Sequence, residues 1–178
     1  MVYITFMRIG MFLVLLITNW RLANLKNYRL YYPTIAFIMV INLVASYLTY
    51  DHPLWYFQKS KLFPNDAMVD LWLTFVTFPL IVILYLSRYP YQSQWKRQFA
   101  YIAQWGFLFS LIEGIFIITK GLTYQNGWNF WWSVVVWLVM FPVFTLHHRK
   151  RYLWAWFICI GFLLFIIYYF DIPITEMK

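Results

Sequence analysis

The sequence predicts an all-α membrane protein, a bundle of six transmembrane helices with both termini on the extracytoplasmic side. Composition is the first reason, because 63% of the 178 residues are hydrophobic, 25% are aromatic and 11% are charged. A soluble domain carries about 25% charged residues, so this chain has too few to cover a surface that faces water. The composition also excludes an intrinsically disordered chain, and the single cysteine, Cys159, excludes a disulfide-stapled module.

The second reason is a set of six long apolar runs. A bilayer core about 30 Å thick needs roughly 20 apolar residues of helix to cross it. Six runs come close to or reach that length, at 3–20, 33–50, 67–87, 99–119, 128–146 and 153–170. The runs are continuously apolar, whereas the strands of a membrane barrel alternate apolar and polar residues. Residues 1–178 are therefore expected to form one transmembrane domain.

Proline and asparagine stand where three of these helices should begin. Pro33 falls in the first turn of the second run, where its missing N–H breaks no helical hydrogen bond. Asn65 or Asp66 precedes the third run, and Asn129 stands at the start of the fifth. Side chains of these types cap the free N–H groups of a helix, so we expect capped third and fifth helices.

The basic residues give the direction of the helices. Nine of the 14 lysines and arginines fall in segments 21–30, 88–98 and 147–152, which contain no acid. The alternate segments are balanced, with Lys59, Lys61, Lys120 and Lys178 against Asp51, Asp66, Asp171 and Glu176. Because basic loops stay in the cytoplasm, both termini are predicted outside. We expect these basic loops to attract anionic lipids of the bilayer, and we do not expect nucleic acid as a partner.

The fourth run contains a stripe of small residues. Gly106, Ser110 and Gly114 recur every four residues, so they share one helix face that another helix can approach closely. Two alternatives stay open: the stripe closes the bundle within one chain, or it joins two copies in a homo-oligomer.

Three ionisable residues fall inside the predicted helices: Arg8, Asp70 and Glu113. Each costs at least ~2.5–3.5 kcal/mol near the bilayer centre, so each needs a partner or water. At 1.5 Å per residue, Arg8 and Glu113 lie ~9 Å and Asp70 lies ~6 Å below the outer ends of their helices. Three helices thus place one cation and two anions at a similar depth below the extracytoplasmic face.

Two interpretations of these charges stay open. In the first, they form an ion-pair network that holds helices together, with Arg8 neutralising Glu113 or Asp70 and Lys120 reaching the other acid. In the second, they line an outward-facing polar pocket. There, Asp70 and Glu113 bind a cation or share a proton, and Arg8 holds an anionic group or tunes their pKa values. The pocket interpretation depends most on Glu113.

Two extracytoplasmic segments flank this level. Residues 51–66 are rich in aromatic residues, which suits either a simple connection in the headgroup layer or a lid over an outward-facing cavity. The second segment holds the turn signal Asn126-Gly127 and then Trp128, which anchors at the interface. Asn126, Trp128 and Asn129 are the residues of this segment expected to border the mouth of the pocket.

Signatures of enzymes and cofactors are scarce. The chain has no glycine-rich phosphate loop, no nucleophile elbow and no zinc-protease motif. His147-His148 has no third metal ligand nearby in the sequence, so we expect no metal site, no cofactor and no catalytic residue. The leading hypothesis is a non-enzymatic protein that binds or conducts a small solute or ion. The alternatives are a structural or sensory subunit held together by its buried charges, and a membrane-embedded enzyme that acts on a lipid headgroup.

One block of the sequence resembles a known group of proteins. It consists of Asn126-Gly127-Trp128-Asn129, Trp131-Trp132-Ser133 and Met140-Phe141-Pro142. It is similar to an uncharacterised family of small multi-pass membrane proteins from spore-forming Gram-positive bacteria. The resemblance implies a location in a bacterial plasma membrane, and it implies nothing about chemistry.

Overall fold

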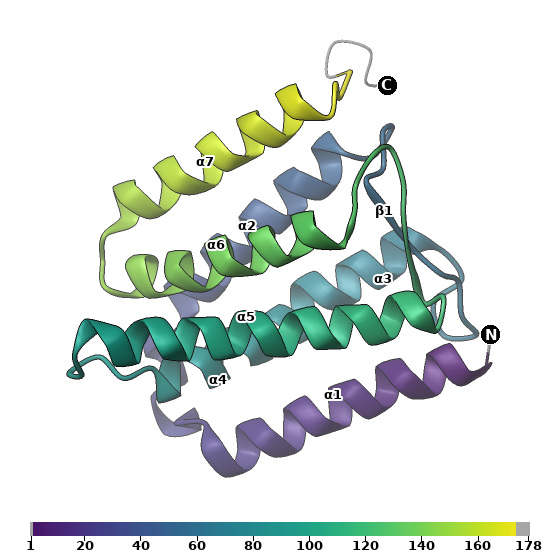
Figure 1. Ribbon diagram of the computed structural model, residues 1–178. Helices are drawn as coiled ribbons and strands as arrows, with labels where there is room; N and C mark the ends of the chain where they lie inside the picture. Colours follow the sequence, from purple (N-terminus) through teal and green to yellow (C-terminus); the bar gives the residue numbers. More distant parts are fainter. Residues whose placement is uncertain (1, 174–178) are drawn as a thin grey trace.

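Six long helical rods lie side by side in the computed structural model, which describes residues 2–173 (Figure 1). Glu176, Lys178 and the C-terminal end lie outside the described residues. The elements in order are α1 (Val2–Leu22), the 3-10 helix η1 (Leu25–Leu30), α2 (Tyr32–Leu48), β1 (Trp55–Phe57), α3 (Asp66–Trp72), the π-helix η2 (Leu73–Thr77), α4 (Phe78–Arg88), α5 (Trp95–Ile118), β2 (Leu122–Tyr124), α6 (Phe130–His148) and α7 (Tyr152–Tyr169).

Five of the rods are long and apolar enough to cross a membrane, by length and composition. They are α1, the continuous rod from Asp66 to Arg88, α5, α6 and α7. The remaining rod, α2, has 17 residues and is apolar but shorter. Helix α5 begins at Trp95, four residues before the predicted run at 99–119. The exposed Lys96 and Arg97 fit its first turn because both residue types are good helix formers.

The predicted helix starts are confirmed. The side-chain oxygen of Asn65 accepts a hydrogen bond from the backbone N–H of Met68 at 2.8 Å. The side-chain oxygen of Asn129 accepts from the N–H groups of Trp131 and Trp132 at 3.0 and 3.4 Å. Pro33 lies in the first turn of α2, as expected. These contacts satisfy N–H groups that a helix leaves free at its N-terminus.

The rod from Asp66 to Arg88 changes its winding in the middle. Residues Leu73–Thr77 form a π-helix, directly before Phe78 and Pro79. Proline has no N–H to donate, and its ring clashes with the carbonyl one turn earlier, so a regular α-helix cannot pass through this point undisturbed. The wider π turn accommodates the proline within one continuous rod.

The three basic segments lie together at one end of the molecule. Arg88 Nε donates to the carbonyl of Leu22 at 2.6 Å, and an Arg149 guanidinium N–H donates to the carbonyl of Tyr91 at 3.4 Å. The opposite end holds the start of α1 and both strands (Figure 1). There, the Tyr3 hydroxyl donates to the carbonyl of Thr119 at 3.0 Å. The charge asymmetry along the sequence is therefore an asymmetry between the two ends of the bundle.

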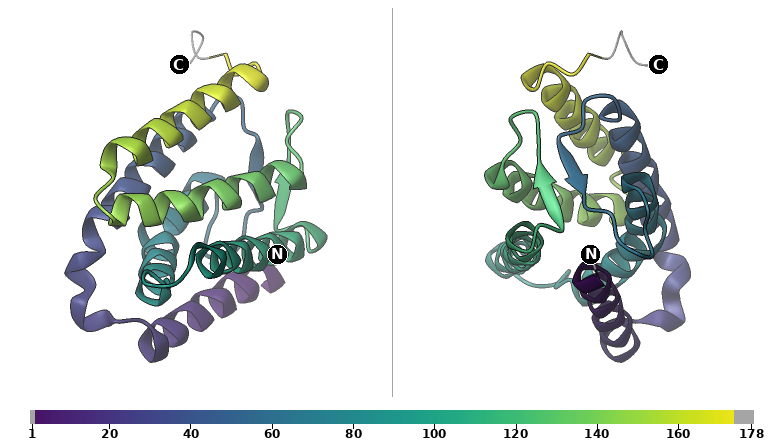
Figure 2. Two further views of the ribbon diagram at one scale, coloured as in Figure 1. Left: turned by 60° about the vertical axis from the view of Figure 1, so that its left-hand side comes forward. Right: turned by 90° about the vertical axis from the view of Figure 1, so that its right-hand side faces the viewer.

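The structure also contains a short β-sheet, which the all-α prediction did not include. Strands β1 and β2 pair antiparallel, with Trp55 opposite Tyr124 and Phe57 opposite Leu122. The two strands come from the two segments that were predicted on the extracytoplasmic side. The end-on view shows them lying across the middle of the ring of helices (Figure 2, right).

The small-residue stripe of α5 packs inside the chain. Gly106 and Ser110 are buried, and a Cβ added at Gly106 would lie 3.0 Å from the Leu138 side chain of α6. A Cβ added at Gly114 would lie 3.9 Å from Phe130 at the start of α6. The stripe therefore closes the bundle internally, which was one of the two alternatives. A homo-oligomer stays a prediction, without this face as its interface.

Candidate ligand-binding cavity

A cavity of about 250 Å³ lies among the helices. Every one of the six rods contributes to its walls, and so do β1 and β2. Most of the wall is aliphatic or aromatic. The polar and charged residues on it are few, and they come from α1, α2, α3, η2, α5 and α6: Arg8, Asn42, Asp70, Thr77, Glu113 and Ser133. The three charges predicted at one depth thus face one cavity.

Glu113 is held by two hydrogen bonds from neutral donors. The Tyr124 hydroxyl donates to Glu113 Oε1 at 2.8 Å, and the Trp137 indole Nε1–H donates to Oε2 at 2.6 Å. Ser133 extends the chain, because its hydroxyl lies 3.2 Å from the Tyr124 hydroxyl and accepts from Trp128 Nε1 at 3.0 Å. Because the Tyr124 hydroxyl donates to Glu113, the Ser133 hydroxyl donates to Tyr124. Each hydrogen bond in this network is therefore donated in the direction of the Glu113 carboxylate.

The Tyr124 hydroxyl is suited to be a permanent donor. Burial raises the pKa of Tyr124 above its ordinary value, and the nearby negative charge of Glu113 raises it further. Tyr124 therefore keeps its proton throughout the physiological range. A carboxylate has about four acceptor positions on its two oxygens, and the protein fills two of them on Glu113. Acceptor capacity thus remains at the cavity wall.

Asp70 is arranged in the same way on another wall. Ser46 Oγ donates to Asp70 Oδ2 at 2.6 Å, and Asn42 Nδ2 donates to Oδ1 at 3.3 Å. Asn42 Nδ2 also donates to Thr74 Oγ1 at 2.7 Å, which ties α2 to η2. Asn42 thus joins α2 to the neighbouring rod, and its side chain also lines the cavity. Both carboxylates therefore accept only from uncharged groups of the protein in the hydrogen bonds described.

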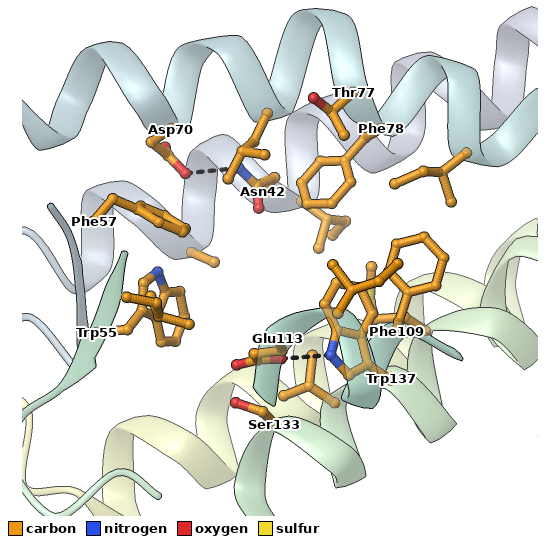
Figure 3. A pocket seen from close by; sticks show the side chains of 18 of the residues that line it. Asn42, Trp55, Phe57, Asp70, Thr77, Phe78, Phe109, Glu113, Ser133 and Trp137 are labelled. Atoms are coloured by element: carbon orange, nitrogen blue, oxygen red, sulfur yellow. Dashed lines mark hydrogen bonds between the residues drawn. The ribbon is translucent and has the colours of Figure 1, made fainter. Parts of the chain in front are cut away.

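The two acids face the cavity from opposite sides. Figure 3 shows Asp70 beside Asn42 on one wall and Glu113 beside Trp137 and Ser133 on the other. Trp55 and Phe57 of β1 close one end of the space between them (Figure 3). The arrangement leaves two separated negative charges around a largely aromatic space.

Arg8 has a different set of partners from the ones predicted. Its guanidinium donates to the carbonyl of Gln58 at 2.8 Å and to Ser60 Oγ at 3.3 Å, and it lies 5.7 Å from the centre of the Phe63 ring. Arg8 is 5% exposed and also borders the cavity. The predicted ion pair from Arg8 to Glu113 or Asp70 is therefore not the contact that holds the guanidinium. The loop after β1 curls over α1 and offers uncharged acceptors at closer range.

One hydroxyl on the cavity wall has no partner. Thr77 is 3% exposed, and its Oγ1 is buried without a hydrogen bond among the described residues. Thr77 is the last residue of the π-helix and lines the cavity. A buried hydroxyl without a partner costs free energy, and π-helical segments occur frequently at functional sites.

The sheet covers the end of the cavity that lies away from the basic segments. Trp55, Phe57 and Leu122 of the strands line it, together with the buried Trp128. The rings of Trp55 and Trp128 meet edge to face with centres 5.2 Å apart. The N–H of Phe57 donates to Asp66 Oδ1 at 2.6 Å, which fixes β1 to the start of α3. Of the two roles considered for residues 51–66, these contacts fit the lid.

Asn126, predicted at the mouth of the pocket, and Lys120, predicted to reach one of the acids, both lie outside the cavity lining. Asn126 is exposed at the tip of the turn, with φ 49°, and its Nδ2 donates to the carbonyl of Pro53 at 2.8 Å. This contact ties the second loop to the first. Lys120 is exposed in the left-handed conformation, with φ 56°, just after α5. Both residues shape the ends of the segment that forms β2.

The sequence interpretation missed Tyr124 and Trp137, the two direct partners of Glu113. Trp137 had a usable signal, because it lies in the middle of an apolar run and a buried indole N–H needs an acceptor. Ser133 and Trp137 are also four residues apart, so they share a helix face. Tyr124 carried no such signal, since its position depends on the pairing of β2 with β1.

The His, Cys, Asp and Glu side chains of the described residues do not gather as the ligands of a metal ion would. No group of three or more His, Cys, Asp and Glu side chains in residues 2–173 is placed to hold one. The acids that face the cavity are on opposite walls, as described above. No protein-family model, curated protein sequence or solved structure matches the chain.

Proposed function

We propose that this protein binds a small organic cation in its central cavity, which the cation enters from the extracytoplasmic side of a plasma membrane. In this proposal all six rods cross the bilayer, α2 included, and both termini lie outside. The clustering of the basic segments at the end opposite the sheet supports that orientation, since basic loops stay in the cytoplasm. The ~26 Å length of α2, at 1.5 Å per residue, is close to the bilayer core.

The observation that carries the proposal is the pair of carboxylates on opposite walls of one aromatic cavity. Asp70 and Glu113 each retain unused acceptor capacity, whereas the guanidinium of Arg8 is engaged by Gln58 and Ser60 of the loop. Arg8 also lies within electrostatic range of Asp66. The charge of the cavity is therefore negative overall, and a cation is its complement.

The walls favour an organic cation over a bare ion. A bare ion needs several oxygen ligands around one point, but the two acids are separated by the width of the cavity. Trp55, Phe57 and Trp137 add aromatic faces and edges. Aromatic faces attract cations, and they also cover the apolar part of an amine. The volume of about 250 Å³ is just below the range of typical small-molecule pockets, which suits a compact ligand.

A set of three ring compounds of similar size tests the proposal. Benzylammonium, benzyl alcohol and benzoate differ in charge but share one aromatic ring. We expect calorimetry on the full chain in phosphatidylcholine nanodiscs to show the tightest binding for benzylammonium, at least tenfold over the alcohol. Asp70→Asn is expected to weaken that binding, whereas Asp171→Asn, an exposed acid at the same end, is the matched control.

Equal binding of benzylammonium and benzyl alcohol would contradict the role of the carboxylates. Preference for benzoate would show that Arg8 dominates the cavity. Absence of binding by benzylammonium would contradict a pocket for small organic cations and would favour the interpretation in which the buried charges only hold helices together.

A further inference from the structure

At the basic end of the bundle, a second hollow lies between the end of α4 and the first turns of α5. Its volume is about 390 Å³, and it is lined by Arg88, Pro90, Arg97, Ala100, Tyr101 and Gln104. It is separate from the central cavity, because the two share no lining residue. Two of its six residues are arginines, and none is acidic.

The two arginines come from different helices and meet at the same hollow. Arg88 is the last residue of α4, and Arg97 is in the first turn of α5. Arg88 Nε is occupied by the carbonyl of Leu22 at 2.6 Å, which fixes the side chain and leaves its terminal nitrogens available. Guanidinium groups bind phosphate oxygens in a bidentate manner. A phosphate between the two arginines would meet donors from both helices.

The hollow extends along α5 to a polar residue, Gln104, which lies farther from the basic end than Arg97 does. Arg97, Tyr101 and Gln104 are spaced by four and three residues, so they share one face of the helix. Gln104 follows Arg97 by seven residues, which is ~10 Å along the axis. Gln104 is exposed next to the exposed apolar side chains of Phe107 and Leu108. An amide on an apolar, outward face of a membrane helix needs a polar partner from outside the chain.

We infer that this hollow is a binding site for one anionic phospholipid of the cytoplasmic leaflet. Its phosphate lies between Arg88 and Arg97, and its glycerol ester region runs along Ala100 toward the amide of Gln104. Basic pockets between helices on the cytoplasmic side bind lipid headgroups in this way. A free phosphate would use the two arginines but would make no contact with Gln104. The order of charge, small residue and amide along α5 therefore selects a lipid.

Native mass spectrometry of the delipidated full chain tests the inference, with phosphatidylglycerol and phosphatidylcholine as the probes. We expect phosphatidylglycerol to bind at least tenfold more tightly than phosphatidylcholine. Arg97→Gln should weaken the binding of phosphatidylglycerol about tenfold, and Arg97→Lys should weaken this binding less. Gln104→Leu should weaken both lipids about threefold, since both carry the ester groups. Arg151→Gln removes an equal charge from the same end, outside the hollow, and should change binding less than twofold.

Three outcomes would overturn the inference. Equal losses of phosphatidylglycerol affinity in Arg97→Gln and Arg151→Gln would show that the whole basic end attracts the lipid diffusely. Displacement of the lipid by excess soluble glycerol phosphate, with no effect of Gln104→Leu, would show a phosphate site and not a lipid site. Equal affinity for the two lipids would show that the arginines do not distinguish an anionic headgroup from a zwitterionic one.

Discussion

Replacing Glu113 separates its charge from its hydrogen bonds. In Glu113→Gln, the amide oxygen can still accept from Trp137 Nε1, and the new NH2 group can donate to the Tyr124 oxygen. Tyr124 then turns its O–H toward Ser133, which lies 3.2 Å away. The two hydrogen bonds of Tyr124 reverse direction, and no partner is lost. The indole N–H groups of Trp137 and Trp128 donate as before. We therefore expect the free energy of unfolding to change by less than about 1 kcal/mol, the difference between a hydrogen bond to a charged and to a neutral acceptor.

Glu113→Leu removes both acceptors. Tyr124 can still turn toward Ser133, but the indole N–H of Trp137 has no second partner that replaces the contact at 2.6 Å. A buried donor without an acceptor costs about 1–3 kcal/mol, so this variant should be less stable than Glu113→Gln by about that amount. Adding Trp137→Phe should recover most of the loss, because the double variant leaves no unpaired N–H.

Two measurements compare these variants with the wild type: the free energy of unfolding in detergent and the Kd for benzylammonium in nanodiscs. We expect Glu113→Gln to weaken binding about 10- to 100-fold, which corresponds to about 1.4–2.8 kcal/mol, while stability is kept. A Glu113→Gln variant that binds benzylammonium as the wild type does would refute the role of the charge. A variant that unfolds while the remaining folded fraction binds normally would show that Glu113 serves only to hold α5 and α6 together.

Three further predictions follow from the fold. Asn129→Ala should lower the free energy of unfolding by about 1 kcal/mol, because the N-terminal cap of α6 is lost. Unfolding in detergent measures this change, and an unchanged free energy would show that the cap hydrogen bonds are not formed. Arg8→Leu should raise the rate of amide hydrogen exchange in residues 55–63 at least tenfold, because the contacts to Gln58 and Ser60 are lost. The exchange rate in α6 should stay constant, and an equal change in both regions would contradict the anchoring role of Arg8. In a Cys159→Ala background, an impermeant maleimide applied outside intact cells should label a cysteine placed at Gln125 and not one placed at Gln92, and the reverse pattern would invert the proposed orientation.

Much of the helical framework could be predicted because it depends on local properties of the chain. A run of apolar residues is read one residue at a time, and the caps at Asn65 and Asn129 act within three residues of their own position. The depth of Arg8, Asp70 and Glu113 followed from helix rise alone. They meet at one cavity because α1 and α3 begin at the end of the bundle where α5 finishes (Figure 1).

The features that escaped prediction depend on contacts far apart in the sequence. Strands of three residues carry no readable pattern, and β1 and β2 are 67 residues apart in their central pair, Tyr56 and Thr123. The partners of the charges also depend on that pairing, because β2 places Tyr124 beside Glu113. Sequence reasoning pairs opposite charges by default, whereas the protein satisfies each acid with nearby hydroxyl, amide and indole donors.

The reactivity of Cys159 tests the central claim most directly, because this single cysteine of the chain lies on the wall of the cavity. Two methanethiosulfonate reagents of similar length, one with a trimethylammonium group and one with a sulfonate, are applied from outside to the protein in sealed cells. The account predicts that the cationic reagent modifies Cys159 at least tenfold faster than the anionic one, and that Asp70→Asn and Glu113→Gln each reduce this ratio. Equal rates, a faster anionic reagent, or no modification by either would contradict a negatively charged cavity that is reached from the extracytoplasmic side.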